Sequence, residues 1–294
     1  MHIPVLKKEI LEILNPQPKE NFIDCTLGGG GHTFAILEKI GIRGKLLAID
    51  RDEEAIFKIK QEKRKFGNNL ILACDNFANL KEIVEKNNFP KADGILLDLG
   101  LSSEQLQEGK RGFSFQKDEK LDMRFNPKVQ KISAQEIINE WPEQEIEKIL
   151  KEYGEERFSL KIARNIAKHT RPVKSTLQLV EIIKASTPGW YHHQKIHFAT
   201  KTFQALRMAV NDELNNLKKV LPQALDVLNK KGRLAVISFH SLEDRIIKNF
   251  LRENYHNKKI LLINKKPIMA GASEVKTNPR SRSAKLRGAI KTYE

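Results

Sequence analysis

The chain has 294 residues, enough for one large domain or for a domain that carries a second one as an insertion. Its 52 Lys and Arg residues against 37 Asp and Glu residues give a formal net charge of +15, which favours a polyanionic partner such as nucleic acid. No apolar run approaches the ~18 residues of a membrane span, and the N-terminal stretch lacks the apolar core of a signal peptide. We therefore expect a cytoplasmic protein with no membrane partner.

The N-terminal third alternates between two hydrophobic periods. Residues 1–14 have the pattern of an amphipathic helix, and the rest favours βαβ units that build a parallel sheet. Strands are predicted at 22–27, 45–50, 69–74 and 94–99, and helices at 32–40, 53–66 and 79–87.

The character of the chain changes after about residue 104. Between 105 and 200 we find only helical patterns, separated by turn signals at Pro142, Gly154, Pro172 and Pro188–Gly189. A long helical stretch at 202–228 then leads back to strands at 233–239, 259–264 and 286–293, with a helix at 241–254. The sequence predicts one α/β domain, residues 1–104 and 201–294, interrupted by an all-helical insertion at 105–200.

Four consecutive glycines, Gly28 to Gly31, follow the first predicted strand. A strand, a glycine-rich turn and a helix N-terminus together form a generic site for an anionic group. The dinucleotide pattern GxGxxG fails because Thr33 or Phe34 occupies the third glycine position, and the P-loop pattern fails because His32 follows the last glycine. The loop alone therefore does not identify its ligand.

Acidic residues lie at the ends of the next three strands. Asp50 closes the second strand, 20 residues after Gly30, where a doubly wound fold places an acid on a ribose hydroxyl; Asp75 and Asp98 end the third and fourth. These ends meet at one edge of a parallel sheet. S-adenosylmethionine (AdoMet), with a ribose, a cationic centre and no phosphate, suits such an acidic rim, and its adenine could lie against Phe77.

Ten segments resemble, in the right order, the MraW family of ribosomal RNA small subunit methyltransferases H. They are HIPVL (2–6), DCTLGGGGH (24–32), AIDRD (48–52), DGILLDLGLSS (93–103), RGFSF (111–115), LDMRF (121–125), YGEERF (153–158), FATKTFQALR (198–207), SFHSLEDRI (238–246) and NPRSRS (278–283). The resemblance implies a class I AdoMet-dependent methyltransferase fold, Rossmann-like with a mostly parallel seven-stranded sheet and an inserted helical domain. It also implies methylation of the exocyclic N4 amine of a cytosine in the decoding region of 16S rRNA.

The resemblance also assigns the AdoMet contacts. The matching residues are Gly30, Gly31, His32, Asp50, Phe77, Asp98 and Gln105. The partner that it implies is 16S rRNA, within the small ribosomal subunit. The sequence leaves the oligomeric state open, with a homodimer as one option.

The cytosine amine needs a hydrogen-bond acceptor that frees its lone pair for attack, and an in-line position. Many amino-methyltransferases supply these through a D/N-P-P-Y/F motif, but here the fourth strand continues as DLGLSS (98–103). We infer that the acceptor comes from Asp98, from the backbone near Leu99–Gly100, or from Ser102 or Ser103.

Aromatic and basic residues further along suggest where RNA binds. Phe113 and Phe115, next to Arg111, could hold the target base on a π face, or could belong to the core of the insertion. His240 could accept a proton, although a hydrogen-bonded structural role is the commoner one for such a histidine.

Two basic stretches favour phosphate contact. Five cations recur at helical spacing without an acid between 157 and 174: Arg157, Lys161, Arg164, Lys168 and Arg171. The segment 258–291 has ten Lys or Arg and one acid, and NPRSRSAKLR, with Arg280 and Arg282, suggests a flexible phosphate-binding arm. Neither the histidines 192, 193 and 197 nor the two cysteines have the neighbours of a metal site, so we expect no metal.

Two other classes of function remain open. A non-catalytic RNA-binding assembly factor would explain the charge but not the acidic pocket. A nicotinamide-dependent oxidoreductase would explain the fold and Asp50 but fails at the third glycine of its fingerprint.

Overall fold

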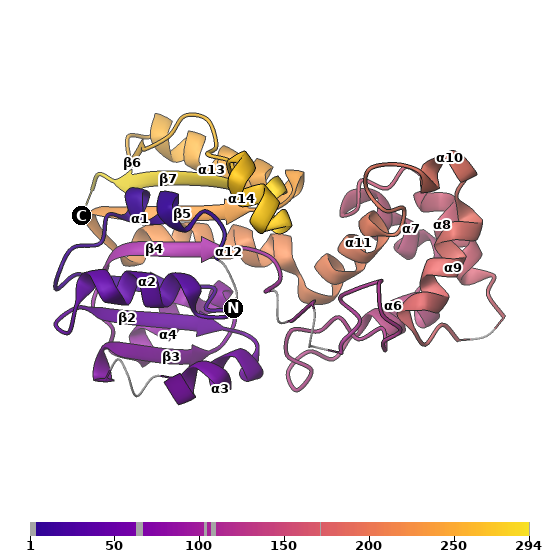
Figure 1. The fold of residues 1–294 in the computed structure, drawn as a ribbon, viewed down its shortest axis with the longest axis horizontal. Helices are drawn as coiled ribbons and strands as arrows, with labels where there is room; N and C mark the ends of the chain where they lie inside the picture. The colour runs from indigo at the N-terminus through magenta and orange to yellow at the C-terminus, as the bar shows by residue number, and fades with distance from the viewer. Residues whose placement is uncertain (1–3, 63–66, 103–104, 107–109, 171, 294) are drawn as a thin grey trace. The chain divides into compact units, whose positions relative to one another are not determined.

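The computed structural model describes residues 4–62, 67–102, 105–106, 110–170 and 172–293. The chain divides into two compact units, the first formed by Met1–Leu101 and Leu214–Glu294 and the second by Ser102–Glu213 (Figure 1). The second unit ends later than the predicted residue 200. Helix α11 (Thr200–Asn211) belongs to it because that helix packs on α6 (Ala134–Glu140) and α7 (Glu143–Glu152).

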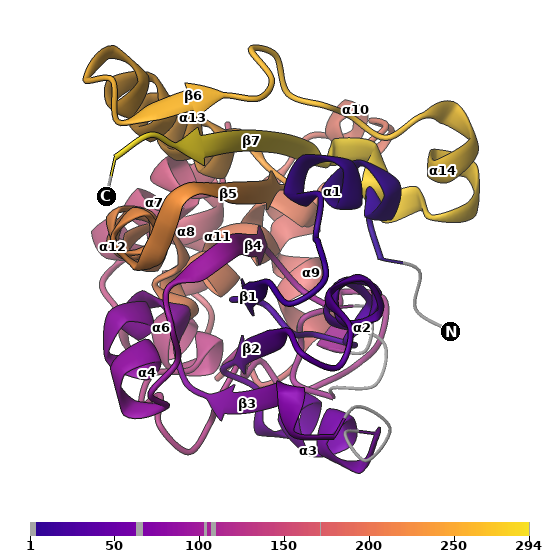
Figure 2. The ribbon, with the colours of Figure 1, turned by 90° about the vertical axis from the view of Figure 1, so that its left-hand side faces the viewer.

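A seven-stranded sheet in the order β3-β2-β1-β4-β5-β7-β6 forms the centre of the first unit (Figure 2). Strands β1 to β5 are parallel, and β7 is antiparallel to both of its neighbours. This is the mostly parallel Rossmann-like sheet that the sequence predicts. The strands are β1 (Asn21–Asp24), β2 (Lys45–Asp50), β3 (Leu70–Cys74), β4 (Ala92–Asp98), β5 (Leu228–Ser238), β6 (Ile260–Leu262) and β7 (Lys285–Lys291).

Helices cover both faces of this sheet, which is why its central strands are apolar on both sides. One face packs against α1 (Lys7–Leu14), α2 (Gly31–Ile40) and α3 (Glu53–Glu62). The other packs against α4 (Leu80–Lys86), α12 (Glu213–Val227) and α13 (Ser241–His256). Strand β1 pairs with β2 on one side and β4 on the other, so the strand order reverses there. Ligands of such folds bind beyond the carboxyl ends of the strands at this switch point.

The predicted helical stretch 202–228 is two helices. Asp212 adopts a left-handed backbone conformation with φ of 51° and separates α11 from α12. The buried Asn211 side chain fixes this break, because its amide donates to the Met123 carbonyl at 2.7 Å and its oxygen accepts from the Phe125 N–H at 3.0 Å. Aspartate is one of the few residue types that tolerate this conformation.

The second unit is helical in its described residues, with α8 (Ser159–Ala167), α9 (Thr176–Ser186) and α10 (Gly189–His192) completing it. Its core comes from apolar residues at helical spacing, such as Ile162 and Ile166 on α8. Among the described residues of the whole chain, no helix is long and apolar enough to cross a bilayer.

Candidate functional site

Hydrogen bonds join the ends of β1 and β4. The buried Asp24 carboxylate accepts from the Thr33 hydroxyl at 2.7 Å and from the Thr26 N–H at 3.0 Å. Burial raises the pKa of Asp24. The Thr26 hydroxyl oxygen in turn accepts from the Asp98 N–H at 2.7 Å. The position of Asp98 is therefore set by the turn that follows β1.

Asp50, at the end of β2, holds the glycine turn in place. One carboxylate oxygen accepts from the Gly28 N–H at 2.8 Å and the other from the Asp52 N–H at 2.9 Å. Burial is the largest influence on Asp50 and raises its pKa to about 6, in spite of these bonds. Each carboxylate oxygen can accept a second hydrogen bond, so Asp50 can also receive ligand hydroxyls.

The backbone of the turn requires glycine at two positions. Gly28 and Gly30 have φ of 47° and 76°, the left-handed region that side chains disfavour. A Cβ atom on Gly30 would also lie 2.7 Å from the Phe34 ring. Gly30 precedes the first residue of α2, so the turn leaves the helix N-terminus accessible to a ligand anion.

The N-terminal segment packs against this turn. A Cβ atom on Gly31 would lie 3.0 Å from the Pro4 ring, so glycine allows the segment to approach. The segment is also fastened from the far end of the chain, because the Leu6 N–H donates to Glu274 Oε1 at 2.8 Å. Glu274 lies on α14 (Ala272–Thr277).

His32 and Asp98 face each other across the switch point. The distance from His32 Nε2 to Asp98 Oδ2 is 3.6 Å, and the two side chains are 7% and 20% exposed. His32 Nε2 and Asp98 Oδ1 are both buried and have no hydrogen-bond partner in the described part of the chain. Because a buried polar atom without a partner is costly, this pair suits a polar ligand that bonds to both atoms.

Phe77 and Asp75 follow β3. Phe77 is half-buried, begins a short 3₁₀ helix and packs against the core. Asp75 accepts from the Asn76 N–H at 2.6 Å and from the Asn79 side chain at 3.0 Å, so its carboxylate stabilises this turn. The Asp75 carboxylate is thus occupied by the turn, whereas part of the Phe77 ring is exposed and could contact a ligand.

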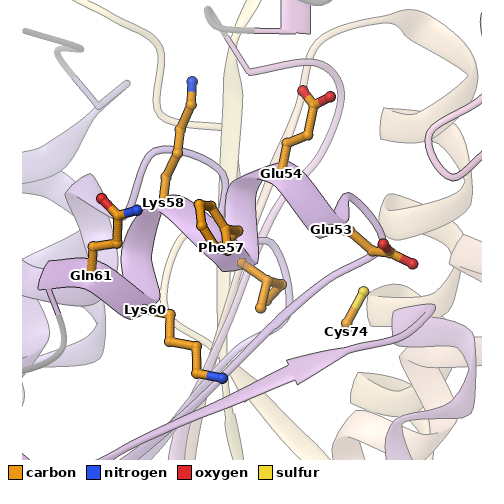
Figure 3. Close-up of a pocket in the computed structure, with 8 residues that line it drawn as sticks. Glu53, Glu54, Phe57, Lys58, Lys60, Gln61 and Cys74 are labelled. Carbon is orange, nitrogen blue, oxygen red and sulfur yellow. The ribbon is translucent and has the colours of Figure 1, made fainter.

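A separate cavity of about 600 Å³ lies beside α3, on the edge of the sheet (Figure 3). Glu53 and Cys74 lie together at one end of it, and Lys58 and Lys60 extend in opposite directions from the helix. Phe57 in its lining is 64% exposed. The described lining residues include none of the predicted cofactor contacts.

Other predicted site residues open the second unit. Ser102 and Gln105 bond to each other, since the Ser102 N–H donates to Gln105 Oε1 at 3.0 Å and the Gln105 N–H donates to the Ser102 hydroxyl at 3.2 Å. Ser103, a predicted acceptor, and Arg171, a predicted RNA contact, lie outside the described residues.

The RGFSF segment is packed within the second unit. Phe113 is 7% exposed and stacks on Phe125, so it is a core residue in this structure. Arg111 donates to the Phe125 carbonyl at 2.8 Å. Phe115 is half-buried and stacks on His197 with ring centroids 4.6 Å apart. Of the two phenylalanines, Phe115 is the one that keeps part of its side chain exposed.

The basic stripe is exposed but is not free of acids. Arg157, Lys161, Arg164 and Lys168 are all exposed along α8 and its flanks. Arg164 forms an ion pair with Glu143 of α7, with Nε and Oε1 3.5 Å apart. An acid absent from the local sequence is thus supplied by the neighbouring helix. For Lys161 and Lys168 we find no ion pair among the described residues.

The C-terminal basic segment is folded, which corrects the prediction of a flexible arm. Arg280 and Arg282 lie in a 3₁₀ helix (Pro279–Ser283) whose Ser281 is buried and donates to the Asn278 carbonyl at 2.8 Å. The segment continues directly into β7, between β5 and β6, and is fixed by that strand pairing. Arg282 is exposed and Arg280 half-buried.

His240 caps α13. Its Nδ1 accepts from the Glu243 N–H at 3.4 Å, and Glu243 accepts from the Phe239 N–H at 2.9 Å. The reciprocal bonds resemble a capping box, in which the two residues satisfy the free donors of a helix N-terminus.

Sequence reasoning did not identify Thr26, Thr33 or Glu274 as residues that hold this site in place. Thr26 and Thr33 flank the glycines, but only the folded chain aims their hydroxyls at strand-end acids. Glu274 is 268 residues from Leu6 and gives no local signal.

Comparison with known proteins assigns the family. The sequence matches the MraW methylase family over residues 1–292. Ribosomal RNA small subunit methyltransferase H of Heliobacterium mobile is 46% identical over 308 residues, covering 99% of this chain and 98% of the relative. The protein of the same name from Mycoplasma mycoides subsp. mycoides SC is 45% identical and covers 97% of each.

Among solved structures, an rRNA methylase from Streptococcus thermophilus aligns with a TM-score of 0.46 at 12% identity, covering 98% of this chain and 94% of that one. That likeness adds nothing to the sequence match. The match over nearly the whole length carries the conclusion: the chain belongs to the MraW methylase family.

Proposed function

We propose that this protein transfers the methyl group of AdoMet to the exocyclic N4 amine of a cytosine in the decoding region of 16S rRNA. Family membership supports methylation, and the names of the relatives support small-subunit rRNA as the substrate. The observation that carries the proposal is the pair His32 and Asp98 at the topological switch point: His32 Nε2 lies 3.6 Å from Asp98 Oδ2, and the buried atoms His32 Nε2 and Asp98 Oδ1 have no hydrogen-bond partner among the described residues.

The residues present fit the methionine and ribose ends of AdoMet. Asp98 Oδ1 is an acceptor without a partner and suits the ammonium group, whereas His32 Nε2 suits the carboxylate next to the N-terminus of α2. Asp50 has acceptor capacity left for ribose hydroxyls, and Phe77 offers an aromatic surface to the adenine. When bound, AdoMet supplies an electrophilic methyl group on its sulfonium.

The chain must orient the cytosine amine and accept a hydrogen bond from it. Asp98 and the backbone carbonyls near Leu99–Gly100 are the acceptors that the first unit offers at the end of β4. Gly100 has φ of 95°, a conformation that turns the chain sharply at this point. Ser102 and Ser103 are the further candidates. Holding the amine in line accounts for much of the rate enhancement in such displacements.

The decisive experiment follows the methyl group. Purified protein is incubated with methyl-labelled AdoMet and either free 16S rRNA or assembled small subunits, and the RNA is digested to nucleosides. We expect labelled N4-methylcytidine as the product. Label in another nucleoside would overturn the proposed specificity, and no transfer to either RNA would favour a non-catalytic assembly factor.

A thermal-shift measurement tests the cofactor independently. AdoMet should raise the melting temperature because it binds only the folded chain. At a concentration one hundred times its Kd, it should add about 2.7 kcal/mol to the free energy of unfolding. NADH should leave the melting temperature unchanged. Stabilisation by NADH alone would support an oxidoreductase instead.

A further inference from the structure

An exposed aromatic cluster joins α10 to the residue that precedes α8. Figure 1 shows both helices in the second unit. Trp190 is 52% exposed although it is one of only two tryptophans in the chain. Its ring centroid lies 5.9 Å from that of the half-buried Phe158 and 5.7 Å from that of Tyr191. The rings of Trp190 and Phe158 thus meet at the surface next to the buried ring of Tyr191, and the largest of the three keeps half of its area in solvent.

The base of this cluster is rigid. Tyr191 is buried, and its hydroxyl lies 3.1 and 3.0 Å from the two carboxylate oxygens of the buried Glu156. Burial, and then the Glu156 charge, raise the pKa of Tyr191 far above its usual range, so the phenol stays protonated and donates to that carboxylate. Glu156 also accepts from the Phe158 N–H at 2.9 Å. One buried acid therefore fixes both neighbours of the exposed tryptophan.

A cation lies over the same rings. The guanidinium carbon of Arg157 is 5.6 Å from the Trp190 centroid and 5.9 Å from the Phe158 centroid. Both distances are within the range of cation–π attraction. Arg157 remains exposed, as does Lys161, four residues later at the start of α8. The surface therefore combines planar groups for stacking with positive charge.

The surrounding sequence strengthens the charge argument. Residues 157–211 contain ten Lys or Arg and a single acid, Glu181. A protein partner that covered Trp190 with apolar surface would also bury the Arg157 guanidinium that lies over its ring, at a desolvation cost. An unpaired nucleotide instead offers a π face to the rings and a phosphate to the cations.

We propose that Trp190, Phe158 and Arg157 form a stacking platform for an unpaired base of the substrate RNA, with Lys161 contacting the adjoining phosphate. The platform rests on the proposed function, because it binds the RNA that the methyl-transfer site modifies. It is a binding site and contributes to RNA affinity, not to the chemical step.

Fluorescence tests the stacking directly. In a Trp141→Phe variant, Trp190 is the sole tryptophan, and its emission reports on its own surroundings. We expect quenching when a ten-nucleotide cytidine oligomer is titrated in, and little quenching with an abasic oligomer of equal length. Equal quenching by the cytidine oligomer and the abasic oligomer would show that charge alone accounts for the contact, and would overturn the proposal that a base stacks on Trp190.

Binding measurements give the size of the effect. Trp190→Ala should lower the affinity for the cytidine oligomer roughly 5- to 150-fold, the range expected for the loss of one stacked base. Trp190→Phe should retain most of the affinity. Tyr255→Ala is the matched control, since Tyr255 is a 45% exposed aromatic residue of the first unit. Unchanged affinity in Trp190→Ala would overturn the inference.

Two further readouts separate this inference from the proposed function. Trp190→Ala should bind AdoMet as the parent chain does, which shows that the first unit is intact. A helical circular-dichroism signal equal to that of the parent chain shows that the second unit, which contains Trp190, is also folded. If the parent chain methylates rRNA and Trp190→Ala has the same KM for it, only the platform is refuted. If the parent chain transfers no methyl group although Trp190→Ala loses oligomer binding, only the proposed function is refuted.

Discussion

The two units handle their polar groups in opposite ways. At the switch point of the first unit, acids are buried and bonded to neighbouring turns, as Asp24 is to Thr33 and Asp50 to Gly28. Along α8 of the second unit, cations are exposed, and Arg164 has only an ion pair at 3.5 Å. The first arrangement is preorganised for one small ligand, whereas the second suits a large polyanion that many weak contacts hold. A single substitution should therefore have a large effect on activity or stability at the switch point of the first unit and a small effect on RNA affinity along α8 of the second.

Asp98→Ala should have the largest effect. If Asp98 accepts the hydrogen bond from the cytosine amine, its loss should lower kcat roughly 10²- to 10⁴-fold, the usual contribution of a positioned proton acceptor. The measurement is methyl transfer from labelled AdoMet at a saturating concentration. Full turnover under these conditions would exclude a catalytic role for Asp98.

Asp93→Ala is the matched control for that change. Asp93 lies near the other end of the same strand and accepts from the Asn21 N–H at 2.9 Å and the Asn229 amide at 2.8 Å. Its loss should lower stability and leave kcat intact.

The pH dependence of AdoMet binding should report on Asp50. Its pKa is raised from 3.8 to about 6, so the folded chain retains this proton where the unfolded chain has lost it. By linkage, Asp50 stabilises the cofactor-free fold most below about pH 4, and this contribution is lost as the pH rises through 6. In the proposed site the ribose hydroxyls donate to the ionised carboxylate, so the affinity for AdoMet should rise, and not fall, as the pH increases through 6.

We expect the affinity for AdoMet to fall by about tenfold per pH unit below pH 6. Calorimetric titration between pH 5 and 8 measures this, and Asp50→Asn should remove the step near pH 6. An affinity that is independent of pH across this range would argue against a bond between the Asp50 carboxylate and the ribose.

Thr33→Val and Thr187→Val compare the two units directly. Thr33→Val leaves the buried Asp24 carboxylate without its 2.7 Å bond, which should lower the free energy of unfolding by roughly 1–3 kcal/mol. Thr187 donates to the neutral Ile183 carbonyl at 2.9 Å, and its Oγ1 also lies 2.9 Å from His192 Nε2. Thr187→Val leaves no buried carboxylate without a bond, so its loss should cost about 0.5–1.5 kcal/mol. Urea denaturation of the cofactor-free proteins decides this. A larger loss for Thr187→Val would contradict the contrast between the units.

The smallest effects should come from the exposed lysines. Replacing Lys161 and Lys168 together by Ala should reduce the slope of log affinity for RNA against log salt by roughly 0.7 for each phosphate that is no longer neutralised. Lys218 and Lys219, exposed on α12, serve as the control pair. Arg164→Ala should change the slope less, because Glu143 already pairs with Arg164. Equal slopes for both lysine pairs would remove α8 from the RNA surface.

The sequence by itself determined which segments form the sheet and which edge of the sheet carries the acids. Short apolar runs for the strands, helical periods between them and acids at the strand ends are local patterns, and the structure places Asp50 and Asp98 at those ends. The family motifs named the chemistry. Local patterns failed where a partner came from elsewhere in the chain, as with the acid that pairs with Arg164 and the strand pairing that orders Arg280 and Arg282.

Only the tertiary structure decided which polar atoms were left without a partner. Hydrogen-bond satisfaction depends on groups that are distant in sequence: Thr26 meets Asp98 across 72 residues and Leu6 meets Glu274 across 268. The same holds for Phe113, which packing buried, and for Trp190, which packing left in solvent. Burial and pairing are properties of the whole fold, so residue type and spacing could not fix them.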